Sequence, residues 1–240
     1  MTLSDSKVLI EDAKNLLKEI ELIYEIDLKN GFVSPILRVK IKQYLDNILA
    51  SLEYATYEIF SRYCAKYIPS NKLKWSESRV YFPSLDDKRK FDNYINDRFP
   101  KLLDEKPEIV DILAKYQPFP THSKWLKHLK LLCNNNKHRY LSNQTYQTNT
   151  QIKNLRFPEG GGISGFTIIS QGDKSPVAYN DQPLDLENPS NLPPGVNFNG
   201  SVVKDFYFTE INEPVLKTLK RIYRSTPTII LDLETVFREN

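Results

Sequence analysis

Glycine is distributed very unevenly along this chain of 240 residues. Only Gly31 precedes residue 158, whereas the other seven glycines lie between residues 160 and 200. Because glycine destabilises helices and is favoured in turns, this distribution predicts a helical first part and a turn-rich β region after it. The contents of 40% hydrophobic and 26% charged residues are those of an ordinary globular protein.

Apolar side chains recur at helical spacing through the first part of the chain. They predict a helix from Ser4 or Ser6 to about Ile26, and a longer one from Ser34 and Pro35 to about Tyr67. Together these two helices read as an antiparallel hairpin. An irregular passage follows, and shorter helices are expected at 86–98, 107–116 and 121–135.

The second half of the chain predicts strands at 152–157, 164–170, 175–179 and 202–209, with a proline-rich loop over 182–195. A last helix is expected from Asn212, interrupted at Pro227. The fold class is therefore α+β. We expect a helical bundle over 1–141, a β-rich region over 142–211, and a C-terminal helix over 212–240 that packs back on the bundle.

Several classes of protein do not fit this sequence. Cys64 and Cys133 lack the spacing of a redox or zinc motif, and two cysteines are too few for a disulfide framework, which favours a reduced, cytoplasmic setting. The charged N-terminus does not look like a signal peptide, and no apolar run is long enough to span a membrane. Three histidines without a nearby carboxylate make a poor metal site, so neither a metal nor a cofactor is expected.

Residues 112–158 contain eight basic and no acidic side chains, and they include all three histidines. The remaining residues carry 25 basic and 30 acidic side chains, so the positive charge is concentrated in this segment. A concentrated positive field attracts phosphate groups, and histidine transfers protons near neutral pH. The segment is the most promising place for a functional site.

A helix over 121–140 would separate packing from chemistry. Its buried face would carry the residues Trp125, Leu126, Leu129, Leu132, Cys133 and Tyr140, and its opposite face Lys127, Lys130, Asn134 and His138. The succession Asn134 to Asn136 could end the helix before His138. His122 and His128 are expected at the surface. His138 stands between Lys137 and Arg139, whose charges favour the neutral imidazole that can act as a base.

Other patterns are explained more simply by structure than by catalysis. The glycine run at 160–165 lacks the ending of a phosphate-binding loop and suggests a tight hairpin or bulge. Cys64 lies on an apolar stripe and reads as a core thiol. Glu53 reads as a surface carboxylate, or as one that faces His138 if their two helices pack together.

The order of four sequence elements resembles that of a group of uncharacterised bacterial proteins. The elements are LASLEYATYEIF, YFPSLDD, AKYQPFP and LKHLKLLCNNNKHRYL, over residues 35–141. Those proteins are similar to the HEPN superfamily of helical bundles. The resemblance implies a helical bundle that is often a homodimer, and in active members an Arg and a His cleave RNA without a metal.

On this resemblance, His138 matches the family histidine and Asn134 the polar residue that often follows the arginine. The arginine position itself falls on Cys133, whose thiol cannot make a guanidinium's bidentate contact with phosphate. Lys130 or Arg139 could supply charge, although neither has the spacing of the motif.

Two hypotheses follow. The first, which we favour, is a non-catalytic interaction or RNA-binding module of a defence or toxin–antitoxin type. RNA would contact Lys124, Lys127, Lys130, Lys137 and Arg139, or a protein partner would be bound instead. The alternative is a metal-independent endoribonuclease that uses His138 and Asn134.

Overall fold

The computed structural model describes residues 3–121, 124–138, 141–172 and 175–238, without the side chains of residues 120, 121, 137 and 138. The chain divides into two compact units, and α1, α2 and α9 each contribute to both. Unit 1 comprises residues 1–20, 38–142 and 217–240, and unit 2 comprises residues 21–37 and 143–216. The expected α+β class is confirmed: long helices precede a small antiparallel sheet, and a helix follows it.

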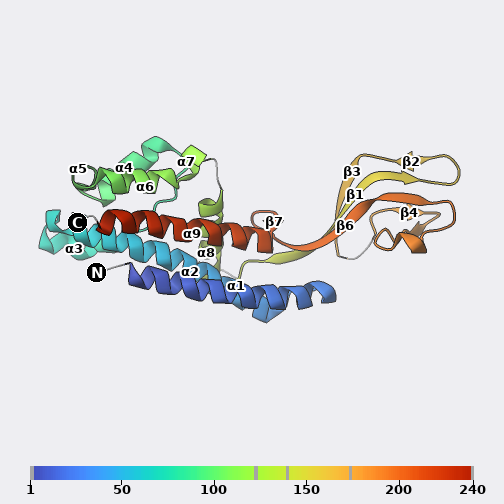
Figure 1. Cartoon of the computed structure of the whole chain (residues 1–240), viewed down its shortest axis with the longest axis horizontal. Coiled ribbons are helices and arrows are strands. Elements are labelled where there is room, and N and C mark those ends of the chain that lie inside the picture. The colour runs from blue at the N-terminus through green and yellow to red at the C-terminus, as the bar shows by residue number, and fades with distance from the viewer. Residues whose placement is uncertain (1–2, 122–123, 139–140, 173–174, 239–240) are drawn as a thin grey trace. The chain divides into compact units, whose positions relative to one another are not determined.

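Three long helices lie side by side in unit 1 (Figure 1). They are α1 (Ser4–Asn30), α2 (Pro35–Ile59) and α9 (Val215–Arg238). The apolar stripe of α2 is fully buried at Leu45, Ile48 and Leu52, as its spacing predicts. The buried Tyr44 hydroxyl donates a hydrogen bond of 2.8 Å to the carbonyl of Leu219 and so ties α2 to α9.

The long helix expected to reach Tyr67 changes its winding before that residue. After Ile59 the chain forms a π-helical turn at Phe60–Cys64 and a 3₁₀ turn at Ala65–Tyr67. The irregular passage then contains an unpredicted helix, α3 (Ser70–Glu77), whose hydrophobic residues are too few to produce a helical pattern. The remaining short helices are α4 (Lys88–Arg98), α5 (Leu102–Glu105), α6 (Pro107–Lys115) and α7 (Pro118–Thr121).

The buried amide of Gln117 joins two of the sequence elements that carry the family resemblance. Its Oε1 accepts a hydrogen bond of 3.0 Å from the backbone N–H of Leu85, and its Nε2 donates to the carbonyls of Pro83 and Leu113. All the side-chain polar atoms of this fully buried amide therefore have partners, which makes Gln117 a structural residue. It fixes residues 83–85 against the end of α6.

The last helix begins at Val215 and continues through Pro227, so the predicted interruption is wrong. Proline removes one backbone donor. Hydroxyl groups on both sides of it bond to other carbonyls of the same helix. Ser225, Thr226 and Thr228 each donate to the carbonyl four residues earlier, at 3.1, 3.0 and 3.3 Å. Buried apolar residues on each side of the proline, including Ile222 and Ile229, hold the helix in place.

Unit 2 is built on two long antiparallel strands, β1 (Gln144–Arg156) and β6 (Asn197–Phe208) (Figure 1). The other edge of β1 pairs with β3 (Phe166–Gln171) and β2 (Gly162–Ile163). The edge of β6 pairs with β7 (Glu213–Pro214). A separate two-stranded ladder joins β4 (Ala178–Tyr179) to β5 (Gln182–Pro183), and a 3₁₀ turn follows at Pro189–Asn191.

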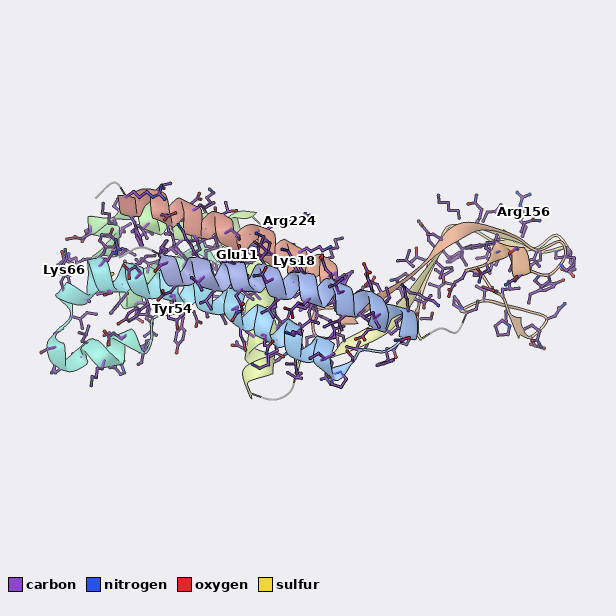
Figure 2. All side chains as sticks on the ribbon, turned by 60° about the horizontal axis from the view of Figure 1, so that its bottom comes forward. Glu11, Lys18, Tyr54, Lys66, Arg156 and Arg224 are labelled. Carbon is purple, nitrogen blue, oxygen red and sulfur yellow. The ribbon has the colours of Figure 1, made fainter. Side chains whose placement is uncertain are left out.

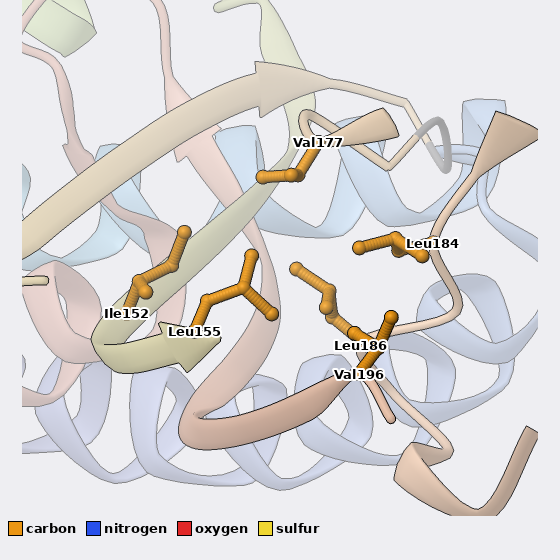
Figure 3. Close-up of a cluster of buried hydrophobic side chains, with 6 residues drawn as sticks. All are labelled: Ile152, Leu155, Val177, Leu184, Leu186 and Val196. Carbon is orange, nitrogen blue, oxygen red and sulfur yellow. The ribbon is translucent and has the colours of Figure 1, made fainter. Parts of the chain in front are cut away.

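Strand β1 begins eight residues before the predicted start at residue 152. The first half, QTYQTNTQ, has no alternation of apolar and polar residues and so gives no strand signal. It is ordered instead by backbone pairing on both edges, with β6 and β3. The predicted strand 175–179 is also shorter, with only Ala178 and Tyr179 paired. The core of unit 2 is small (Figure 3), and it consists of the buried residues Ile152, Leu155, Val177, Leu184, Leu186 and Val196.

Within unit 2, Tyr24 of α1 contacts strand β6. The Tyr24 hydroxyl donates to a carboxylate oxygen of Asp205 and accepts a hydrogen bond of 2.9 Å from the backbone N–H of Phe206. Its ring meets the ring of Phe206 edge to face. Burial, followed by the Asp205 contact, raises the pKa of Tyr24, so the hydroxyl stays protonated and remains a donor.

Within the described ranges, none of the helices is long and apolar enough to span a bilayer.

Candidate functional site

The helix α8 (Trp125–His138) carries most of the residues predicted to form a site, and its packing face is as expected. Every described residue of the predicted buried face is buried; these are Trp125, Leu126, Leu129, Leu132 and Cys133. The thiol of Cys133 donates a hydrogen bond of 3.4 Å to the carbonyl of Leu45 on α2. Cys133 is thus a core contact between helices.

The helix continues through the three asparagines to His138, so it does not end before them. Its amide side chains differ in their surroundings. Asn134 is exposed, whereas the Oδ1 of Asn136 accepts a hydrogen bond of 2.7 Å from the backbone N–H of Ser142. Asn136 therefore fixes the chain where it leaves α8.

The proposed RNA-contacting and catalytic residues separate into three groups. Lys124, Lys127 and Asn134 are exposed. Lys130 is half-buried, and its ammonium group donates to the carbonyl of Phe82. The side chains of His138 and Lys137, and the whole of Arg139, lie outside the described residues, as do His122 and Tyr140.

A groove of about 440 Å³ opens beside Lys130 and Asn134. Its other lining residues come from α2, from the segment held by Gln117 and from α4, and they are Leu49, Glu53, Tyr81, Phe82, Pro83, Ser84, Leu85 and Tyr94. The fold therefore brings the Glu53 carboxylate and Asn134 to one groove, although they are far apart in sequence. Asn134 lies one helical turn before His138.

Two polar side chains of this groove are held by the backbone that lines it. Burial raises the pKa of Tyr94 to about 12, and its hydroxyl donates a hydrogen bond of 2.7 Å to the carbonyl of Tyr81. Lys130 donates to the carbonyl of Phe82, as described above. Both side chains are therefore fixed in place at the groove.

His128 is buried, with an exposed fraction of 7%, so the expectation that it is a surface residue is wrong. The reason is a contact with α9, distant in sequence. The guanidinium of Arg221 lies 3.2 Å from Nδ1 of His128. Because arginine is always a donor, Nδ1 accepts this hydrogen bond and a neutral ring carries its proton on Nε2.

This contact joins α8 to a second basic surface, which was not among the sequence-based predictions. In α9, basic residues recur at helical spacing at Lys217, Lys220, Arg221 and Arg224, and no acidic residue occurs between Val215 and Leu231. All four are exposed except Arg221, which is half-buried. Figure 2 labels Arg224, on the exposed side of α9. The spacing i, i+3, i+4, i+7 was the available sequence signal.

The basic surface consists of Lys124 just before α8, Lys127 on α8, and Lys217, Lys220 and Arg224 on α9. The two helices meet at Arg221 and His128. For Lys124, Lys127, Lys217 and Arg224, no described carboxylate lies within ion-pair distance. These four charges are available to an anionic ligand, and such a ligand gains affinity by releasing counterions.

Other candidate centres have structural roles. Both cysteines are buried thiols, and burial raises the pKa of Cys64 to about 12, so its thiol is unreactive. The described residues contain no group of three His, Cys, Asp or Glu side chains that could hold a metal. The glycine run forms the hairpin between β1 and β2, closed by backbone hydrogen bonds between Phe157 and Gly161 and between Gly160 and Phe157.

No family model matches the sequence, and neither a curated protein nor a solved structure gave a significant match.

Proposed function

We propose that unit 1 is a non-catalytic, HEPN-like RNA-binding module of a defence or toxin–antitoxin type. The proposal rests on the contact between Arg221 and His128, which holds the start of α8, with the exposed Lys124 and Lys127, against the basic stripe of α9. A surface of separate cations on two rigid helices suits the phosphate backbone of RNA, which repeats one negative charge per nucleotide.

The position of Cys133 favours binding over catalysis. Cleavage of RNA without a metal needs a cation that stabilises the charge on the phosphate in the transition state. The residue at that position is a fully buried thiol bonded to the Leu45 carbonyl. A thiol held in the core between two helices offers no such cation.

The alternative, an endoribonuclease acting through His138, is supported by the groove beside Asn134. There the ammonium group of Lys130 would provide the positive charge and the Glu53 carboxylate would orient a donor. We favour it less because Lys130 already donates to the Phe82 carbonyl.

The two functions are separated by one experiment on the full-length protein. Fluorescence anisotropy with a labelled single-stranded RNA measures binding at several salt concentrations in EDTA, and gel electrophoresis of the same samples detects cleavage. We expect binding that weakens with salt and an intact RNA. Cleavage that is abolished by His138→Ala would instead establish the nuclease.

Matched variants test the basic surface itself. The affinity for single-stranded RNA falls with salt, and each lost phosphate contact makes the slope of log K against log salt shallower by about 0.7. Lys124→Ala/Lys127→Ala should therefore make it shallower by about 1.4. Lys72→Ala/Lys74→Ala removes two exposed lysines of α3 and should leave the slope unchanged. Equal slopes for both double variants would place the RNA elsewhere.

The family resemblance also suggests a homodimer, a protein partner from the same system and a cytoplasmic location. Light scattering of the purified protein tests the first of these: a mass near twice the monomer's 28.0 kDa is expected.

A further inference from the structure

Unit 2 contains a cavity of about 500 Å³, which is the size of a pocket for a small organic molecule. It lies next to the small core of unit 2 (Figure 3) and shares Leu184 and Leu186 with it. The other lining residues are Thr148, Thr150, Ser175, Pro176, Pro183, Asp185, Glu187 and Val202.

One lining residue of this cavity has a buried hydroxyl group without a hydrogen-bond partner among the described residues. Thr148, Thr150 and Ile152 point to the same face of β1 because alternate residues of a strand do so, and all three are buried. The Oγ1 of Thr148 donates a hydrogen bond of 2.8 Å to the Gly172 carbonyl. The Oγ1 of Thr150, a residue only 1% exposed, has no hydrogen-bond partner among the described residues. A buried hydroxyl without a partner is unfavourable, and a polar ligand group would satisfy it.

The charged side chains among the described lining residues are acidic. Two carboxylates line the cavity, and its described lining residues include no lysine, arginine or histidine. Glu187 is already paired with Lys204, at 2.7 Å. Asp185 is instead held by amide donors: Asn188 donates from its backbone at 3.0 Å, and Asn191 from its side chain at 2.9 Å.

These amides keep Asp185 charged and fixed. The Asn191 side chain, followed by Asn188, lowers the pKa of this carboxyl. No described cationic side chain lies within ion-pair distance of Asp185. The described lining residues of the cavity therefore combine apolar side chains, an ionised carboxylate and an unsatisfied hydroxyl.

We propose that this cavity binds a small molecule that has an apolar body, a protonated amine for Asp185 and a hydrogen-bonding group for Thr150. An anion of the same size is disfavoured because both charged side chains among the described lining residues are negative. The site lies wholly within unit 2 and does not depend on the function proposed for unit 1.

The test uses ¹⁹F NMR titration of the full-length protein with 3-fluorotyramine, whose amine and phenol match the two polar ends of the site. The comparison compounds have the same ring, with a carboxylate or a hydroxyl in place of the amine. We expect saturable binding of the amine that is at least about tenfold tighter than that of either comparison compound. No saturable binding of the amine, or equal binding of all three compounds, would overturn the proposal.

Variants locate the amine within unit 2. Asp185→Asn should weaken amine binding by about tenfold, because it replaces the charged carboxylate with a neutral amide of nearly the same shape. Asp181→Asn removes an exposed carboxylate from the turn between β4 and β5 and should leave binding unchanged. Equal effects of the two changes would show non-specific attraction and contradict the proposal.

Two further variants keep the test decisive if Asp185→Asn disturbs its loop. Val202→Phe fills the cavity from β6 and should abolish binding; undiminished binding would place the ligand elsewhere. Thr150→Val removes only the hydroxyl and should weaken binding several-fold without lowering the melting temperature. An unchanged affinity would remove Thr150 from the site.

Discussion

At the scale of single residues, Asp232 shows how one carboxylate connects two helices of unit 1. Its Oδ2 accepts hydrogen bonds of 2.8 Å from Lys115 and 2.7 Å from Tyr116, which stand at the end of α6. The Lys115 contact is the largest cause of a lowered pKa of Asp232. The same carboxylate, after burial, raises the pKa of Tyr116 to about 12.

Asp232→Asn should lower the free energy of unfolding at pH 7 by about 1 kcal/mol, as measured by urea denaturation. The folded pKa lies below the ordinary value of 3.8, so the stabilisation is complete above that value and disappears as the pH falls through the lowered pKa. The difference between wild type and variant should therefore shrink below about pH 4.

Asp86→Asn is the control, because its ion pair with Lys90 is 3.6 Å long and exposed. It should change stability by less than about 0.5 kcal/mol. A pH-independent difference for Asp232→Asn would mean that the charge does not contribute.

At the scale of elements, the pairing of β1 with β6 depends on a glycine. The register of the two strands shifts between Ile152 and Asn154, and Gly200 lies opposite Ile152. A Cβ at Gly200 would stand 2.1 Å from the Gln151 carbonyl oxygen and 2.6 Å from the Phe198 ring. The backbone oxygen cannot move aside without breaking the pairing, so only glycine fits there.

Gly200→Ala should therefore destabilise unit 2 by about 1–3 kcal/mol, measured as faster hydrogen exchange in β1 and β6. Gly161→Ala is the matched control, since a Cβ there meets no atom within 4 Å. Comparable destabilisation by both substitutions would contradict the steric explanation.

At the scale of the whole molecule, the two proposed ligands bind residues of different units. The basic surface belongs to unit 1, and the acidic cavity to unit 2. RNA and an organic amine also require opposite charges from the protein, so neither ligand suits the other's site.

Variants of one unit should thus leave the other ligand's affinity unchanged. We expect Lys124→Ala/Lys127→Ala to bind 3-fluorotyramine within about twofold of wild type, and Val202→Phe to bind RNA within about twofold. Anisotropy and ¹⁹F NMR on the same protein samples measure both affinities. A larger cross-effect would reveal coupling between the units.

Much of the helical architecture was predictable because its causes are local. Apolar spacing alone placed α1, α2 and the buried face of α8, including Cys133. It could not place β1 before residue 152, since hydrogen bonds to two neighbouring strands order that segment. Nor could it anticipate the helix through Pro227, which buried apolar neighbours hold in place.

In the candidate site, too, some features have local causes and others depend on contacts between distant segments. The order of residues alone specifies which side chains are cationic and which face of α8 is polar, because charge and helical period are properties of nearby residues. Packing between distant segments, in contrast, buries His128 against Arg221, and it places Glu53 and Asn134 in the lining of one groove. It likewise places Thr150 and Asp185 in the lining of one cavity. Each of these joins residues far apart in the chain, and such contacts depend on how whole helices and strands pack.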